Sequence, residues 1–413
     1  MWCLLASAGQ ATAAVEIALR LETSLGHNSN LFRNDATASA NATDPDAPTP
    51  QPIPATATGT RATSAAVGIG IPLGSDATRL TLTTRLGQLS YSHPHELSNR
   101  PTDHTAQLTW RLTEMASAKI AMGRSRSAYA FDDTYPQLDT VTRDWRSASL
   151  TLKATPSIEF PVQVGSSTYA YADKLTHAYL DTDQTSASVS TLYRSPTGST
   201  AQLGLARIHT RYPGRQRTDA SEAQERDSDT FVELLWAYSV KTQATVRLTS
   251  RQRRFADTGI GGRHLTLYRL SVNHTLSPLM RFDAQLWRQP TQTAEAVVAY
   301  GESRGLGLGM TYTPSPKTTI SLQAQKESQT DELLPGAPAW GITNPETTRL
   351  ALRTQYEWTR GVNVFWEAAH EKRTRRVTQH ATQNVWRVGL EYSFENMPGA
   401  NYRTQPANAP LLQ

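Results

Sequence analysis

The sequence of 413 residues has almost no cysteine and no long apolar run. Its single cysteine, Cys3, excludes an internal disulfide and a set of cysteine metal ligands. No apolar run approaches the roughly 18 residues that a membrane-spanning helix needs, and the mean hydropathy is −0.49. A helical membrane protein is therefore excluded.

Lysine and basic tracts are also scarce. The 41 Lys and Arg residues nearly balance the 36 Asp and Glu residues, which leaves a net charge of +5. Only seven of the basic residues are Lys, and they do not gather into the runs that bind nucleic acid. We therefore expect no nucleic-acid partner, and a surface whose cationic chemistry is mainly that of arginine.

The first residues are similar to the end of an export signal. Residues 1–14 read MWCLLASAGQATAA, a short apolar stretch followed by the A-x-A cleavage pattern Ala11–Ala13. An ordinary N-terminal segment is the alternative. We interpret residues 1–13 as the remainder of a signal peptide, whose removal would leave a mature chain without cysteine.

From Val15 onward, the dominant hydrophobic period is two. Apolar Val15, Ile17, Leu19 and Leu21 alternate with Glu16, Ala18, Arg20 and Glu22. The pattern recurs along the chain and ends with Trp386, Val388, Leu390, Tyr392 and Phe394. In a β-strand this period places apolar and polar side chains on opposite faces. No segment of ten or more residues has a clean helical period, so an all-β fold is predicted.

Connections of two kinds separate the alternating segments. Eight short links rich in turn residues fall at 73–77, 113–117, 155–157, 195–200, 240–242, 277–278, 313–317 and 359–361. Nine longer polar connections fall at 26–59, 92–104, 127–139, 173–180, 212–227, 254–263, 289–301, 328–346 and 372–381. Together they predict about eighteen antiparallel strands in up-and-down order, with sixteen as the alternative. Both termini then lie on the short-turn side, as in outer-membrane barrels.

Apolar and polar residues also alternate along the strands of a soluble β-sandwich. The positions of the aromatic residues distinguish a membrane barrel from such a sandwich. The apolar face carries aromatic side chains near strand ends, at Tyr91, Trp110, Tyr193, Trp236, Tyr238, Tyr312, Trp358, Trp366 and Trp386. Such residues form girdles at the two membrane interfaces of transmembrane barrels. Scattered core aromatics are the alternative. We predict a transmembrane β-barrel over residues 14–395, in contact with the lipid of the outer membrane of a Gram-negative bacterium.

The last predicted strand carries the most specific pattern. Its sequence Arg387-x-Gly389-x-x-Tyr392-x-Phe394 resembles the assembly signal of outer-membrane barrels, in which a glycine precedes two aromatic residues. The residues of this signal are Gly389, Tyr392 and Phe394. The chain continues beyond it, and we interpret the Pro- and Asn-rich residues 396–413 as a periplasmic tail.

The predicted lumen face carries both signs of charge. A barrel of 16 to 18 strands holds an aqueous lumen unless a plug fills it, and fixed charges on its wall set selectivity. The candidate lumen residues are Arg20, Arg247, Arg251, Arg253, Arg349, Arg353, Glu367, Arg387 and Glu391. Cross-strand ion pairing that braces the wall is the favoured interpretation. The alternative is recognition of an acidic polymer or sugar acid by arginine.

A motif after the first strand adds a family resemblance. The segment Gly26-His27-Asn28-Ser29-Asn30-Leu31-Phe32-Arg33 resembles the Asn-Leu-Phe-Arg segment of EpsL-type exopolysaccharide-operon barrels, of the β-barrel porin-2 group. Members of that family commonly carry an acidic residue where Asn28 or Ser29 stands. The resemblance implies an outer-membrane channel that exports a secreted polysaccharide, together with inner-membrane polymerase and copolymerase machinery.

Other functions receive less support. The ten histidines are scattered, and the pair His93-x-His95 alone is a weak metal pattern. No nucleotide-binding or serine-hydrolase motif is present, so neither an enzyme nor a cofactor is expected. Three hypotheses remain: a polysaccharide-export channel, a diffusion porin for small anions or oligosaccharides, and an outer-membrane enzyme or adhesin.

Overall fold

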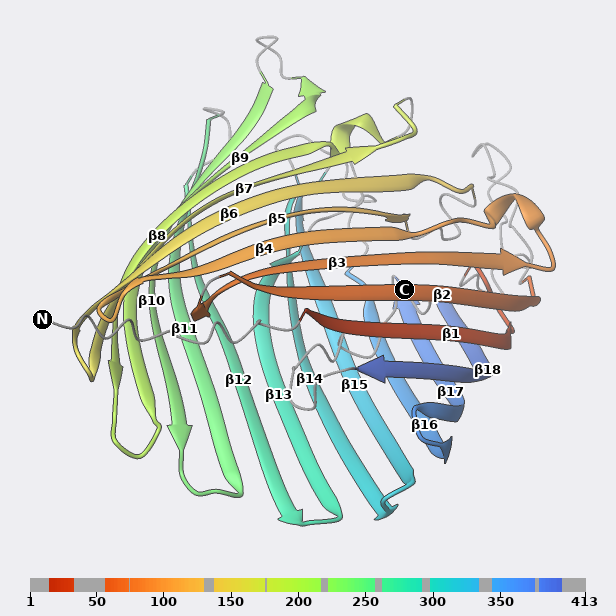
Figure 1. The fold of residues 1–413 in the computed structure, drawn as a ribbon. Coiled ribbons are helices and arrows are strands. Elements are labelled where there is room, and N and C mark those ends of the chain that lie inside the picture. The colour runs from red at the N-terminus through yellow and green to blue at the C-terminus, as the bar shows by residue number, and fades with distance from the viewer. Residues whose placement is uncertain are drawn as a thin grey trace, which may run out of the picture.

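The computed structural model describes residues 15–32, 56–73, 75–129, 137–174, 177–216, 222–256, 262–291, 298–333, 344–375 and 379–395. These residues form a single closed β-barrel (Figure 1). Among them, no helix has the length and apolar character needed to cross a bilayer. The predicted signal remnant 1–13 and the predicted tail 396–413 lie outside the described residues.

The barrel has eighteen strands, as the alternating sequence predicts. In the described parts of the long connections, η2 (His95–Leu97) and η3 (Ala178–Leu180) are single-turn 3-10 segments. The strands are β1 (Glu16–Asn28), β2 (Thr58–Leu73), β3 (Ser75–Tyr91), β4 (Thr102–Thr113), β5 (Ala116–Ala128), β6 (Thr140–Thr155), β7 (Ile158–Tyr171), β8 (Thr182–Arg194), β9 (Thr200–Gln216), β10 (Glu222–Ala237), β11 (Thr242–Phe255), β12 (Arg263–Ser277), β13 (Met280–Thr291), β14 (Val298–Ser315), β15 (Thr318–Leu333), β16 (Glu346–Thr359), β17 (Val362–Arg375) and β18 (Gln379–Glu395).

Each strand pairs antiparallel with its neighbours in sequence, and β18 pairs with β1 to close the wall. At this closure Leu21 lies opposite Tyr392, and Glu22 lies opposite Glu391. Short and long connections alternate at the predicted places. Several predicted connections are wrong in their bounds, because the strands on either side run further than the sequence predicts. The largest difference is at 212–227, where β9 runs to Gln216 and β10 begins at Glu222. Strands also extend into the predicted connections 289–301, 328–346 and 372–381.

The outer face of the barrel is apolar. On β10, Val232, Leu234 and Trp236 point outward and are 40%, 45% and 58% exposed, whereas Phe231 on the inward phase is 5% exposed. The same alternation exposes large apolar side chains on strands all around the barrel. Because closure pairs the strand backbones, such a wall can bury this face in lipid without leaving backbone groups unsatisfied.

The aromatic residues of the outer face agree with the sequence prediction, with one exception. Tyr312 shares the outward phase of β14, and seven others are well exposed: Trp110, Tyr193, Trp236, Tyr238, Trp358, Trp366 and Trp386. Tyr91 is the exception, since it is only 9% exposed and packs in a cluster with Leu31, Phe32, Leu89 and Leu97. Its assignment to the girdle is wrong because the apolar residues at this end of β3 pack inward, beneath the start of the first long connection.

Four aromatic rings on the inward face lie against glycines of the neighbouring strand. The direct cross-strand pairs are Trp145 with Gly123, Phe231 with Gly204, Trp287 with Gly305, and Phe365 with Gly389. In each pair, a Cβ atom on the glycine would clash with the ring. The missing side chain therefore lets a large ring lie flat along the wall instead of projecting into the lumen.

Candidate functional site in the barrel lumen

Inward-facing arginines on β11 form a ladder of ion pairs with β10. Each arginine lies directly opposite its carboxylate: Arg247 with Glu233, Arg251 with Asp229, and Arg253 with Asp227. Arg251 binds Asp229 through two hydrogen bonds of 2.8 and 2.7 Å, and Arg253 binds Asp227 through two of 2.9 and 2.8 Å. Bidentate pairs of this kind fix the guanidinium plane as well as its position. We call these six residues the β10–β11 ladder.

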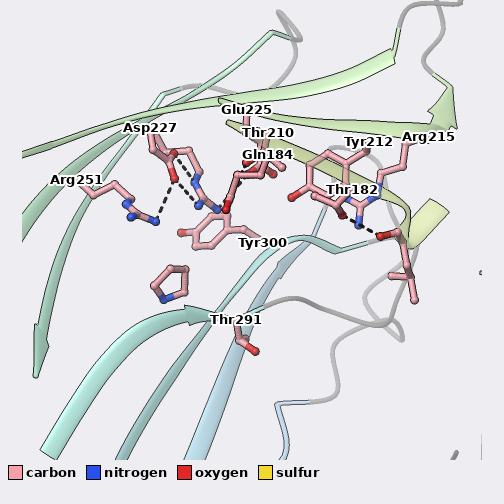
Figure 2. Close-up of a pocket in the computed structure, with 13 residues that line it drawn as sticks. Thr182, Gln184, Thr210, Tyr212, Arg215, Glu225, Asp227, Arg251, Thr291 and Tyr300 are labelled. Carbon is pink, nitrogen blue, oxygen red and sulfur yellow. Dashed lines mark hydrogen bonds and ion pairs between the residues drawn. The ribbon is translucent and has the colours of Figure 1, made fainter. Parts of the chain in front are cut away.

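A cavity of about 200 Å³ adjoins the long-loop end of this ladder (Figure 2). Its wall includes Arg251, Arg253, Tyr212, Arg215 and Glu225. Arg215 lies over the ring of Tyr212, 4.2 Å from its centroid, and its Nε donates to the carbonyl of Tyr179 at 2.8 Å. The cavity is therefore lined by aromatic and polar groups that are already held in place.

Glu225 extends the acidic side of the cavity beyond the lipid-facing part of β10. Its carboxylate lies 3.4 Å from Nη1 of Arg253. Asp227 and Glu225 thus face Arg251 and Arg253 on this wall. Arg215 adds a third cation to the lining of the cavity.

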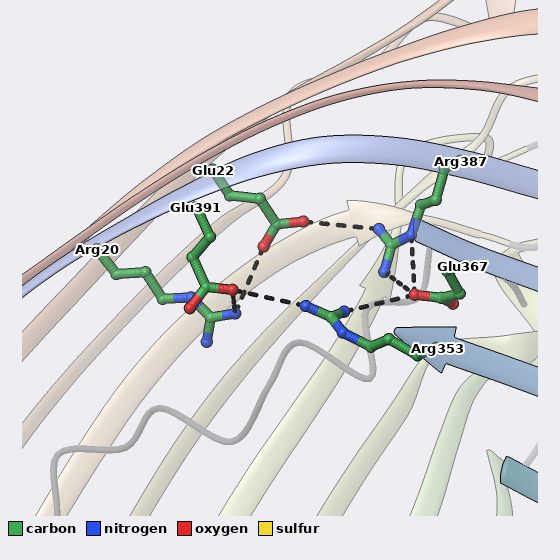
Figure 3. A network of polar contacts seen from close by, with 6 residues as sticks. All are labelled: Arg20, Glu22, Arg353, Glu367, Arg387 and Glu391. Atoms are coloured by element: carbon green, nitrogen blue, oxygen red, sulfur yellow. Dashed lines mark hydrogen bonds and ion pairs between the residues drawn. The ribbon is translucent and has the colours of Figure 1, made fainter. Parts of the chain in front are cut away.

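A second network joins the two ends of the chain at the barrel closure (Figure 3). Arg387 of β18 binds Glu367 of β17 through Nε at 3.1 Å and Nη2 at 2.7 Å. Across the closure, Nη2 of Arg20 on β1 binds Glu391 on β18 at 2.8 Å. The six members, which we call the closure network, are Arg20, Glu22, Arg353, Glu367, Arg387 and Glu391.

The closure network compensates two carboxylates of like charge. Glu22 and Glu391 lie directly opposite each other in the strand register, an arrangement that is unfavourable without a cation. Arg387 approaches Glu22 at 3.6 Å, and Arg353 approaches Glu391 at 3.5 Å. Three arginines therefore balance three glutamates in this network, which makes it electrically neutral.

The ring of Phe365 packs beneath two arginines of the closure network. Its side chain is 1% exposed, and the guanidiniums of Arg353 and Arg387 lie 4.5 and 5.4 Å from its ring centroid. Cation–π contacts of this kind hold arginine heads flat against the wall. Only one buried donor here lacks a hydrogen-bond acceptor among the described residues, Nη1 of Arg387.

The structure thus brings eight of the nine predicted lumen residues into ion pairs. Arg247, Arg251 and Arg253 belong to the ladder, whereas Arg20, Arg353, Glu367, Arg387 and Glu391 belong to the closure network. Arg349 is different: it lies opposite Glu371 in the register, but no described carboxylate lies within ion-pair distance of it.

Sequence reasoning missed most of the acidic partners. Asp227 and Glu225 fell within or beside a predicted loop, and Asp229 and Glu233 were not singled out. A strand starting at residue 222 would have placed Asp227, Asp229 and Glu233 on one face by their spacing of two and four residues. Glu22 was recognised as inward-facing, but pairing of β1 with β18 was needed to place it beside Arg387.

The segment after β1 is fastened to β18 at the long-loop end. The amide of Gln383 donates to Oδ1 of Asn28 at 3.0 Å and to the carbonyl of Asn30 at 2.9 Å. Asn30 in turn donates to the carbonyl of Thr382 at 3.0 Å. Leu31 and Phe32 then pack into the cluster that contains Tyr91. The motif Asn28–Phe32 therefore fastens the start of the first long connection to the inside of the barrel mouth; Arg33 and residues 34–55 lie outside the described residues.

The three assembly-signal residues lie on both faces of β18. Tyr392 and Phe394 point outward and are 39% and 45% exposed. Gly389 points inward, where the ring of Phe365 covers it. The spacing of the pattern thus follows the two-residue period of a strand that has a lipid face and a packed lumen face.

Histidine chemistry remains sparse in the described part of the chain. The rings of His93 and His95 lie 5.1 Å apart, and Nδ1 of His95 lies 2.9 Å from the carbonyl of Tyr91. No group of three or more potential metal-ligating side chains occurs among the described residues.

Closed strand pairing, an apolar outer face and a charged inner face together define the class of protein. The chain is an integral β-barrel of the Gram-negative outer membrane. No protein-family model matches the chain, and no curated protein matches its sequence.

The solved structures of OccK2 support this assignment of fold. The barrel is similar to OccK2 (OpdF) of Pseudomonas aeruginosa, with a TM-score of 0.52, 9% identity, and coverage of 93% of this chain and 98% of that chain. The structure of OccK2 in complex with glucuronate has a TM-score of 0.51 and 9% identity, and the match covers 93% of this chain and 98% of that chain. The siderophore receptor PirA of Acinetobacter baumannii has a TM-score of 0.48 and 8% identity, and the match covers 93% of this chain and 81% of that chain. At these identities the likeness concerns the fold alone.

Proposed function

We propose that the barrel is an outer-membrane channel through which a secreted polysaccharide leaves the cell. The observation that carries this proposal is a polar inner wall on which two networks pair their arginines with carboxylates. A sugar polymer offers many hydroxyl groups and few strong charges, so it needs hydrogen-bonding partners along its path and no dominant field. The ladder and the closure network, with their cations and carboxylates already paired, provide such a surface.

Small and flat side chains on the inner wall also favour a polymer path. The inward positions of β2 are Thr60, Ala62, Ser64, Ala66, Gly68 and Gly70, as their register with β1 places them. On the β13–β14 wall, Trp287 lies along Gly305 and donates through Nε1 to Ser303 at 3.2 Å. Rings that lie flat against the wall leave room in the lumen and offer an apolar face to a passing sugar ring.

The motif at Asn28–Phe32 links the proposal to the resemblance noted in the sequence. Its side chains fasten the first long connection at the barrel mouth, the place where a channel's entrance is shaped. The expected partners are inner-membrane polymerase and copolymerase proteins that deliver the polymer. A neighbouring cluster of glycosyltransferase genes would agree with this assignment.

A diffusion porin for small anionic solutes is the second candidate. The observation in its favour is Arg349, an inward-facing arginine that has no ion-pair partner among the described residues. The comparison structure of OccK2 holds glucuronate, which illustrates the class of small solute considered. For such a porin, Arg349→Glu would weaken anion preference in planar bilayers.

Gene deletion separates the two functions. For an export channel, deletion abolishes the secreted polysaccharide while uptake of small sugar acids continues, and a plasmid copy restores secretion. For a diffusion porin, deletion slows growth on a small anionic substrate and leaves secretion unchanged. Unchanged secretion in the deletion strain would overturn the proposal.

A further inference from the structure

Three arginines gather on the outer, lipid-facing surface of the barrel. Arg207 lies on β9, Arg226 on β10 and Arg254 on β11, and all three side chains are exposed. They share the outward phase of their strands with Leu205, Val232 and Leu248, which are 56%, 40% and 53% exposed. We call these three residues the outer arginine patch.

The strand register concentrates the positive charge of this patch. Arg226 lies directly opposite Arg254 across β10 and β11, and it lies opposite His209 on β9. Arg207 occupies the next outward position on β9, diagonal to Arg226. Like charges placed directly opposite each other destabilise a sheet unless a counter-charge lies between them.

No counter-charge comes from the described part of the chain. No described carboxylate lies within ion-pair distance of Arg207, Arg226 or Arg254, whereas the outward-facing Arg124, Arg288 and Lys326 are each paired. Nδ1 of His209, beside the patch, is buried and lacks a hydrogen-bond partner. The β10–β11 ladder and the closure network pair their arginines with carboxylates, but this part of the outer wall leaves its arginines to an external anion.

The height of the patch indicates which anion it meets. On β9 the arginine follows the last outward leucine by one outward step, and on β10 and β11 the intervening positions are Ser228, Thr230, Ser250 and Gln252. Arg207 therefore lies next to the apolar band, and Arg226 and Arg254 lie three outward positions beyond it, all on the long-loop side. In an outer membrane, that level holds the phosphorylated headgroups of the outer-leaflet glycolipid.

We propose that Arg207, Arg226 and Arg254 bind the phosphate groups of outer-leaflet lipopolysaccharide. The planar guanidinium donates two parallel hydrogen bonds to a phosphate, which a lysine ammonium cannot do in a fixed geometry. Other outward cations that have no ion pair with a described residue lie toward the long-loop ends of other strands, at Arg146, Arg304 and Lys372. The proposal concerns the membrane-facing surface, so it does not depend on what passes through the lumen.

Native mass spectrometry of the detergent-solubilised barrel tests the site, with lipid A carrying two phosphates as the probe and dephosphorylated lipid A as its partner. We expect the wild type to prefer the phosphorylated lipid at least tenfold. The triple variant Arg207→Gln, Arg226→Gln, Arg254→Gln should lose that preference, and the triple Lys variant should recover only part of it. A matched control, Arg111→Gln, Arg269→Gln, Arg281→Gln, removes the same charge from inward-facing positions and should bind like the wild type.

Two results would overturn the proposal. One is equal binding of both lipids by the wild type, or undiminished phosphate preference in the outer triple variant. The other is displacement of lipid A by millimolar inorganic phosphate, which would identify a site for the free ion instead of the lipid. Recovery of heat-modifiable, folded barrel in each preparation ensures that the comparison is made on folded protein.

Discussion

Arg251 and Asp229 form a bidentate ion pair directly across β10 and β11, with both oxygens of the carboxylate engaged. The pair removes a cation from the field of the lumen without removing the polar surface. Arg253 and Asp227 form a second bidentate ion pair of the same kind. This relationship keeps the ladder polar without leaving its arginines uncompensated, and it can be tested by removing one partner at a time.

Removal of the acidic partner should make the channel anion-selective. In Asp229→Asn, Arg251 keeps its charge but loses its carboxylate, so the wall gains a positive field. The reversal potential in planar bilayers under a salt gradient should shift toward that of chloride. The double variant Asp229→Asn, Arg251→Gln restores neutrality and should return to the wild-type potential; an unshifted potential in the single variant would contradict charge compensation.

The closure network should contribute to barrel stability. Glu391→Gln takes the carboxylate from both Arg20 and Arg353 and should lower the free energy of unfolding by about 1–3 kcal/mol. Urea unfolding in lipid vesicles measures the change. The control Glu346→Gln breaks an exposed pair with Lys326 and should cost under about 1 kcal/mol. Equal losses in the two variants would show that the closure network has no special role.

Gly305 should keep Trp287 out of the lumen. In Gly305→Ala, the new Cβ meets the ring of Trp287 and approaches the carbonyl oxygen of Lys326, so the ring must move away from the wall. Single-channel conductance should fall, and the tryptophan emission should change. Gly307→Ala is the matched control, because its Cβ would lie at an ordinary contact distance of 3.6 Å from the same ring. A conductance loss of equal size in both variants would argue against this role.

Gln383 should hold the first long connection at the barrel mouth. Gln383→Ala removes both hydrogen bonds to Asn28 and Asn30, so current fluctuations through the channel should increase. Thr382→Ala retains the backbone carbonyl that Asn30 uses, and it should behave like the wild type. A quiet current in Gln383→Ala would mean that the packing of Leu31 and Phe32 suffices.

Local sequence chemistry predicts the strands of this barrel well. The two-residue period and the turn residues predict eighteen strands and the order of their short and long connections, because each strand must present one apolar face to lipid; the bounds of the long connections are less well predicted. The inward phase of Arg251 or Glu391 follows from the same period. Tyr91 was misassigned because it lies on the inward phase of β3, opposite to the exposed Leu82 and Leu86, and packs in an apolar cluster there.

Pairing between distant segments could not be predicted in the same way. Glu22 meets Arg387 only because the first and last strands close the barrel, and that register follows from the whole wall. Asp227 lay within a predicted loop, so its face was undefined until β10 was seen to begin at Glu222. The glycine–aromatic pairs likewise depend on cross-strand register, which no single strand sequence specifies.

Single-channel recording of the purified barrel in planar bilayers tests the central claim most directly. The account predicts a steady conductance of weak ion selectivity that linear neutral oligosaccharides reduce as they enter the lumen. A barrel that conducts no ions, or a strongly anion-selective conductance that oligosaccharides leave unchanged, would contradict it.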